Sequence, residues 1–368
     1  MTNLFKQTSE AAKQENTTFD IIASCVLIGG IFLLPFFFLP VLTLPLSFVK
    51  IAFLTFSVFA AVLLWVLGRF KDGIVRIPLS GILASLALVF GVTLLGVFFS
   101  PSPQASLSGD AYEIGTAASF FIFFLLAFLG AVLFESRARL FYLYLAILLS
   151  FAVLFALEAV RVVWGDSFFP YSGLESGAGS LLGKWNDLAL YAGFAGLLSL
   201  ITLEHLTLEK KTRIFFYGIL CLAFLTLAVV NFTLVWGLVG AFAFITAAHR
   251  FSFRFFEKKN AGNGNRAIPF LSVAVLILSV FFIFAGDFLQ NPIADALQIR
   301  QIDVRPAWVS TFEVLKGTWK EHFLLGSGPN LFVKEWLAFK NDAVNNSLFW
   351  DTDFRFGIGL VPTFAVTT

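Results

Sequence analysis

The sequence predicts an all-α protein, a polytopic transmembrane helix bundle with one long helical loop outside the membrane. Its 368 residues are 58% hydrophobic and only 13% charged, with a mean hydropathy of +0.88. In soluble domains about a quarter of the residues are charged. Apolar runs of about 20 residues, the length that crosses a bilayer, recur along the chain. A single long polar stretch, 287–355, follows them. The net charge of +2 gives no indication of nucleic-acid binding.

The apolar runs are separated by short charged clusters, and we expect each run to form spanning helices. They cover residues 21–39, 51–68, 79–99, 117–134, 140–157, 188–203, 214–248 and 268–285. The run 214–248 would form about 52 Å of helix, which is too long for one crossing. Basic clusters flank it at 210–213 and 250–259. Two spans with a turn at Asn231 place both clusters in the cytoplasm, so we predict nine complete spans.

The distribution of basic residues predicts the orientation, because cytoplasmic loops concentrate Lys and Arg. With the N-terminus inside, the inner segments hold 15 of the 25 basic residues and the short outer segments hold 3. We therefore expect a cytoplasmic tail at 1–20, a nine-span region at 21–286, and an extracytoplasmic loop at 287–355. The last run, 356–368, is about 20 Å long as a helix, and we expect it to begin a truncated tenth span.

Two amphipathic helices are predicted within the long loop. The first runs from Pro306, which suits a first helical position, to Glu321. Its aromatic and apolar residues share one face, and such a face suits either the membrane interface or a docking surface on the protein's own spans. After a turn at 326–330, the second helix starts with Asn330 as its cap. The residues expected on these two faces are Trp308, Phe312, Leu315 and Trp319, followed by Phe332, Trp336 and Phe339.

Several outer residues are candidates for binding an anion. Arg300 and Arg305 precede the first loop helix, and a guanidinium grips phosphate oxygens with paired donors. The alternative is a solvated charge or a lipid headgroup contact. Lys184, Asn186 and Asp187 stand at the start of a span, where backbone amides and the helix dipole favour anions, although an ordinary Asn/Asp cap is the simpler interpretation. Glu158 and Arg161 have the spacing of a structural i,i+3 pair.

Motifs for other chemistries are missing from the sequence. The three histidines form no cluster of zinc spacing with the cysteines, and only His322 falls in the outer loop. The Gly326-Ser-Gly328 motif lacks the Gly-Lys-Ser/Thr ending of a phosphate loop. We expect neither a metal nor a cofactor.

Three local motifs, in this order and placement, are similar to those of one known family. The segment 183–189, Gly-Lys-Trp-Asn-Asp-Leu-Ala, is similar to a Gly-Asn-Pro-Asn-x-Leu-Ala element of that family. The segments 305–308 and 321–332 are similar to its Arg-x-x-Trp helix and Gly-x-Gly turn, and the segment 345–349, Asn-Asn-Ser-Leu-Phe, to its His-Asn segment. A large outer loop between the ninth and tenth spans is also that family's hallmark. With these features the chain resembles the O-antigen ligase and polysaccharide polymerase superfamily of bacterial membrane glycosyltransferases.

The resemblance implies a GT-C-like bundle in the bacterial cytoplasmic (inner) membrane. It implies transfer of a glycan from an undecaprenyl-diphosphate carrier to an acceptor hydroxyl, without a metal. Arg305 would neutralise the departing diphosphate, and Asn345 would stand where the family's acceptor-orienting histidine is found. The same comparison makes these residues candidates for substrate binding: Arg300, Lys184, Asn186, Gly326, Gly328 and His322.

Two departures from the family pattern leave alternatives open. Asn345-Asn346 replaces His-Asn, and an amide orients a hydroxyl but is no general base at neutral pH. The family's Ser-Arg pair is also absent, with Asn231-Phe-Thr233 in its place. A base would then be His322 or an unidentified carboxylate. The other hypotheses are a multi-pass transporter or lipid-linked glycan flippase, and an inactive relative; ligase and polymerase are not distinguished.

Overall fold

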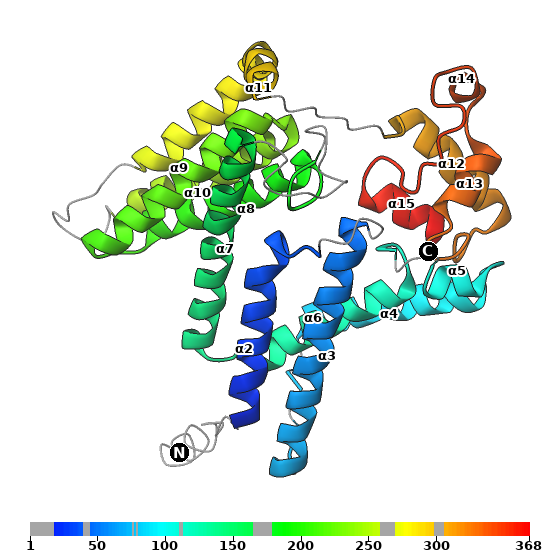
Figure 1. Ribbon diagram of the computed structural model, residues 1–368, viewed down its shortest axis with the longest axis horizontal. Helices are drawn as coiled ribbons and strands as arrows, with labels where there is room; N and C mark the ends of the chain where they lie inside the picture. Colours follow the sequence, from blue (N-terminus) through cyan, green and yellow to red (C-terminus); the bar gives the residue numbers. More distant parts are fainter. Residues whose placement is uncertain are drawn as a thin grey trace. The chain divides into compact units, whose positions relative to one another are not determined.

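The computed structural model describes residues 18–39, 45–75, 77–78, 80–109, 113–164, 179–257, 269–297 and 305–368. Within these ranges all regular secondary structure is helical. The chain divides into two compact units. Unit 1 combines Met1–Gly30, Ser47–Leu143 and Asp303–Thr368, and unit 2 combines Ile31–Leu46 with Tyr144–Ile302. Figure 1 colours the helices along the chain.

Every apolar run predicted to span is helical, which confirms the all-α, multi-pass prediction. Seven helices are long and apolar enough to cross a membrane among the described residues. They are α2 (Thr18–Leu33, continued by the short η1, Leu34–Phe36), α3 (Leu46–Asp72), α4 (Gly81–Phe98), α7 (Arg137–Trp164), α8 (Trp185–His205), α9 (Lys210–Val230) and α10 (Thr233–Glu257). Shorter apolar segments are α6 (Ala117–Leu133) and the first part of α11 (Phe270–Ala296).

The long apolar run 214–248 is divided into two helices at the predicted residue. Asn231 ends α9 in the left-handed conformation, with φ 46°, and its N–H donates to the Leu227 carbonyl at 2.7 Å. Asn tolerates this backbone geometry better than most residues. Thr233 then begins α10, so the predicted division into two helices, each long and apolar enough to span, is confirmed.

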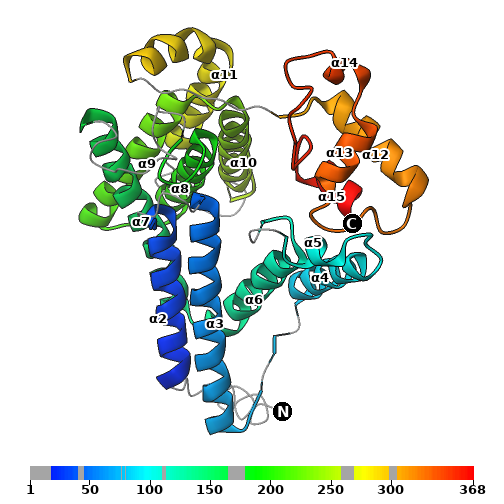
Figure 2. The same cartoon turned by 45° about the vertical axis from the view of Figure 1, so that its right-hand side comes forward.

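In unit 2, α8 is the central helix, and its small residues explain why. Half of its apolar window is buried, the largest share among the seven spans. A Cβ at Gly196 would lie 3.2 Å from the Cβ of Ala223 on α9, and one at Gly193 would overlap Val235 on α10. Small residues let helix backbones approach closely in membranes. Figures 1 and 2 show α8, α9, α10 and α11 lying side by side.

An aromatic stack lies in the middle of this bundle. The indole ring of Trp236 on α10 is parallel to Phe282 on α11, with centroids 4.4 Å apart, and Phe224 of α9 lies on its other side at 5.8 Å. Trp236 is fully buried. The stack therefore joins three helices of unit 2 through one side chain.

In unit 1, α2, α3 and α6 share a core that includes Leu27, Val58, Ala61 and Leu129. Asp20 and Arg69 form a buried ion pair near the end of this core, and Arg69 also lies 3.5 Å from Asp72. Charged residues are costly in a bilayer unless paired or near its surface. The ion pair thus stands at helix ends, as the lipid environment requires.

The end of the chain folds into a small helical subdomain of unit 1, which we call the loop subdomain (305–368). It contains α12 (Trp308–Glu321), α13 (Phe332–Phe339), α14 (Asp342–Asn345) and α15 (Leu360–Thr367). Its core joins Val314 of α12, Phe332 and Trp336 of α13, and Val366 of α15. The predicted aromatic face of α13 therefore docks inside the subdomain.

Two details of the predicted loop helices are wrong. Pro306 is not the first helical residue, because α12 begins at Trp308 with Ala307 as its cap. Asn330 does not cap α13 either; Leu331 holds that position. Asn330 is instead in the left-handed conformation, with φ 64°, and its side chain bonds to residues of another segment.

Candidate functional site

The turn at 326–330 is the best-defined feature of the predicted site. Gly326 and Gly328 have φ values of 54° and 107°, a backbone geometry that favours glycine. A Cβ at Gly326 would lie 2.5 Å from the Val366 carbonyl oxygen, and one at Gly328 would lie 2.6 Å from the Ser100 hydroxyl. The turn is therefore closely packed between α15 and the start of the segment 100–116, which connects α4 to α6. Its glycines serve close packing as well as turning.

This turn is anchored on the segment that joins α4 to α6. The Ser100 and Ser106 hydroxyls lie 2.7 Å apart beneath Gly328. The Asn330 amide donates to the Glu113 carboxylate, and to the Ala105 carbonyl at 3.4 Å. Ala105 belongs to α5 (Pro103–Leu107). The 100–116 segment and the long loop, more than 200 residues apart in the chain, are thus joined by side-chain hydrogen bonds.

Glu113 contacts the loop subdomain through both oxygens of its carboxylate. One oxygen accepts from Asn330, and the other pairs with Arg355. The carbonyl of Glu113 also accepts from the hydroxyls of Thr116 and Ser119, at 2.8 and 2.9 Å, which fixes it to the first turn of α6. The Arg355 side chain is 60% exposed, so this ion pair contributes at most about 1 kcal/mol. The pair therefore adds a contact between the two segments rather than much stability.

The predicted catalytic residues of the loop lie on this anchored subdomain. Arg305 is exposed and stands three residues before α12. Asn345 is exposed and is the last residue of α14, with its N–H bonded to the Asn341 carbonyl at 3.3 Å. His322 ends α12 and is half-buried. No direct hydrogen bond between the side chains of these three residues is observed in the described part of the loop.

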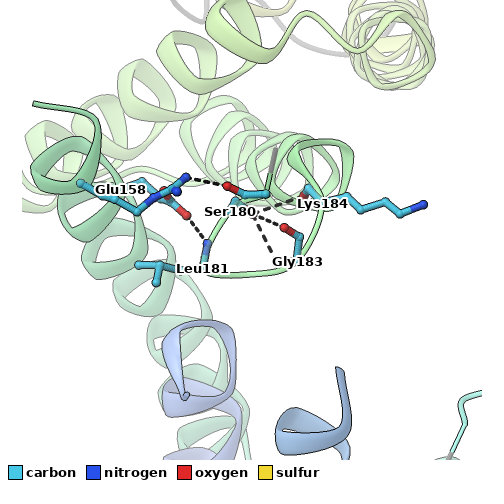
Figure 3. A network of polar contacts seen from close by, with 7 residues as sticks. Glu158, Ser180, Leu181, Gly183 and Lys184 are labelled. Atoms are coloured by element: carbon cyan, nitrogen blue, oxygen red, sulfur yellow. Dashed lines mark hydrogen bonds and ion pairs between the residues drawn. The ribbon is translucent and has the colours of Figure 1, made fainter. Parts of the chain in front are cut away.

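The predicted Glu158–Arg161 pair is confirmed in unit 2, and Figure 3 shows it within a network of polar contacts. Arg161 Nε donates to Glu158 at 2.9 Å, and its Nη2 donates to the Gly179 carbonyl at 2.7 Å. The other Glu158 oxygen accepts from the Leu181 N–H. The Arg161 guanidinium also lies 5.2 Å from the Trp185 ring centroid, a cation–π contact. The network ties the end of α7 to the segment entering α8.

Lys184 and Asn186, the predicted anion-binding residues, follow this network. Lys184 is exposed, and Figure 3 shows its side chain extending away from Glu158. Its backbone N–H donates to the Asp187 carboxylate at 3.0 Å, so Asp187 caps α8 from its third position. Asn186 is half-buried. The capping interpretation is therefore correct for Asp187, and anion binding by Lys184 stays a prediction.

Beside the network lies a cavity of about 300 Å³ in unit 2. Its walls come from the ends of α7, α8 and α9 and are apolar apart from Glu158 and Thr226. Phe155, Trp185 and Val230 are among the side chains that line it. Such a space suits a hydrocarbon chain rather than a polar ligand.

Arg300, the remaining predicted site residue, lies outside the described residues. In the ranges that the structure covers, no three His, Cys, Asp or Glu side chains gather as metal ligands. Sequence reasoning missed Glu113 and Arg355 as partners of the turn. The signals available were Gly109 and Gly115, whose lack of a Cβ leaves room for the Asn330 side chain.

The comparisons with known proteins give no family. No family model, no curated protein and no solved structure matches this chain.

Proposed function

We propose that this chain is a membrane glycosyltransferase of the O-antigen ligase or polysaccharide polymerase type, built on a GT-C-like bundle. It would transfer a glycan from an undecaprenyl-diphosphate carrier to an acceptor hydroxyl at the outer face of the bacterial cytoplasmic membrane. The observation that supports it best is the anchored turn at 326–330. Through this turn the subdomain that carries Arg305 is held at the end of α4, an apolar helix long enough to span.

A lipid-linked diphosphate has its charge at that level, where the hydrocarbon of the bilayer ends. An exposed arginine there neutralises negative charge that grows on the diphosphate as it leaves. In the reaction, the acceptor oxygen bonds to the anomeric carbon, and the bond from that carbon to the phosphate oxygen breaks. The polyprenyl diphosphate departs with the bonding electrons, and the hydroxyl proton passes to solvent. Asn345 would orient the acceptor hydroxyl through its amide.

The test uses the full chain in proteoliposomes with undecaprenyl-diphosphate-linked glycans extracted from bacterial membranes. The readout is release of free undecaprenyl diphosphate, which does not require the acceptor product to be known. Arg305→Ala should reduce release by about 10²–10³-fold, the loss seen when one oxyanion-stabilising donor is removed. Arg305→Lys keeps the charge without the planar fork and should retain part of the activity.

Matched controls come from the same subdomain. Lys334→Ala removes an exposed basic residue of α13 and should leave release unchanged. Asn346→Ala should also leave it unchanged, whereas Asn345→Ala should reduce it. Equal release by Arg305→Ala and the unaltered chain would refute the assigned role. Movement of the lipid-linked glycan across the bilayer without release of diphosphate would identify a flippase instead.

A further inference from the structure

The exposed side of α12 carries large aromatic residues. Trp308, Phe312 and Trp319 are 54%, 43% and 43% exposed. At 3.6 residues per turn they lie within about 40° of one another around the helix. The rings of Trp308 and Phe312 stack at 5.9 Å, and Trp319 packs edge-on to Phe323, itself 73% exposed. We call these four residues the aromatic face.

The neighbouring side of α12 packs through much smaller residues. Thr311, Val314 and Thr318 are fully buried against the rest of the loop subdomain. The Thr311 hydroxyl accepts from the Ile358 N–H at 3.0 Å, and the Thr318 hydroxyl donates to Glu335 at 2.9 Å. The helix is thus docked by its polar and aliphatic side, and its largest apolar side chains face outward. A soluble subdomain would place them the other way.

The position of the subdomain within unit 1 indicates what lies next to this face. Pro329 packs over Gly96, where a Cβ would be 3.2 Å from its ring, and Phe364 of α15 contacts Phe120 at the start of α6 at 5.3 Å. The 18 residues of α4 form about 27 Å of helix, close to the thickness of the bilayer hydrocarbon. Gly96 is near the end of α4, so the subdomain is held where hydrocarbon meets headgroups.

The chemistry of the aromatic face also favours lipid over a protein partner. The Trp319 indole N–H already donates to the Ala365 carbonyl at 2.8 Å, so the ring offers an apolar surface without that donor. Lys316 and Lys320, both exposed, flank the aromatic face. Tryptophan at the interface with lysine beside it is the pattern of segments that lie in the headgroup region.

We propose that the aromatic face of α12 inserts into the outer boundary of the bilayer that the chain's own helices cross, with Lys316 and Lys320 on lipid phosphates. This inference does not depend on the glycosyltransferase proposal. It makes α12 a membrane anchor that fixes the height of the residues before it, Arg305 among them.

Spin labelling of the full chain in proteoliposomes tests this. After Cys25→Ala and Cys221→Ala, a nitroxide is attached at Phe312→Cys, and a control label at Lys334→Cys on α13. Collision with oxygen, which concentrates in lipid, is compared with collision with a water-soluble nickel chelate. We expect the label at 312 to collide mainly with oxygen and the label at 334 mainly with nickel. If Phe312→Cys does not fold, Trp308→Cys is expected to give the same result.

Two results would overturn the proposal. Dominant nickel collision at 312 would place the aromatic face in water, and protection from both reagents would mean that a protein covers it. The lysine contact has its own test in vesicles of phosphatidylcholine with phosphatidylglycerol. There, Lys316→Gln with Lys320→Gln should shift the 312 label toward nickel; an unchanged ratio would refute the phosphate contacts. Failure of glycan transfer would not alter any of these readings.

Discussion

The Glu158–Arg161 pair makes the stability of unit 2 depend on one buried arginine. The two side chains are only 7% and 3% exposed. Arg161→Met keeps an unbranched apolar stem but removes the charged guanidinium group. The Glu158 carboxylate then loses the charge of its partner, and the Gly179 carbonyl loses its 2.7 Å donor. Breaking a buried pair by removing one partner costs about 3–5 kcal/mol.

Thermal unfolding in detergent micelles measures this loss. At about 2–4 °C per kcal/mol for a cooperative unit of this size, the apparent Tm should fall by about 6–20 °C. The matched control is Arg137→Met, at the exposed start of the same helix, which we expect to shift the Tm little. The double variant Glu158→Leu with Arg161→Met should recover part of the loss, because no charge is then left buried. A Tm for Arg161→Met equal to that of Arg137→Met would refute the reasoning.

Three further predictions concern packing and topology. Gly286→Ala should destabilise unit 2 by about 1–3 kcal/mol, because its Cβ would lie 2.4 Å from the buried Asn231 amide. In thermal unfolding, adding Asn231→Gly should restore part of the lost stability. Gly218→Ala, whose Cβ would enter open space, should not lower the Tm. Gly328→Ala should release the turn from Ser100 and expose the loop subdomain to trypsin. The control is Gly81→Ala, whose Cβ would meet no other atom and which should not increase digestion. Equal digestion of the two variants would contradict the anchored turn. In a chain without native cysteines, a membrane-impermeant thiol reagent should label Asp342→Cys in intact cells, and Thr207→Cys only after lysis; the reverse pattern would invert the predicted orientation.

Features that depend on local sequence were predictable. The α9–α10 break at Asn231 followed from run length and flanking charge, and the Glu158–Arg161 pair followed from its spacing. Both loop helices were also predicted, within two residues at their starts. Helix length, charge placement and i,i+3 spacing all depend on residues that are close together in the chain, so a single sequence reveals them.

Features that depend on distant contacts were not predictable. Asn330 looked like a helix cap, because nothing near it in the chain indicates that its amide bonds Glu113 across a separation of 217 residues. The same applies to the orientation of α12. Its periodicity predicts a face of Trp308, Phe312, Leu315 and Trp319, but Leu315 is buried while the aromatic residues are exposed. Which side docks is decided by α13 and α15, and periodicity carries no information on that choice.

The discontinuous make-up of unit 1 has a consequence for how the chain is synthesised. Its last portion begins at Asp303, after all of unit 2 has been translated. Domains generally fold as units, in order from the N-terminus, while the ribosome is still working. Glu113 therefore cannot contact Asn330 until α7 to α11 have been synthesised and inserted. A ribosome that stops just before residue 303 would leave unit 2 able to assemble and the α4–α6 connection without its partner. In such a nascent chain Ser100, Ser106 and Glu113 would lack the contacts that the turn at 326–330 makes with them.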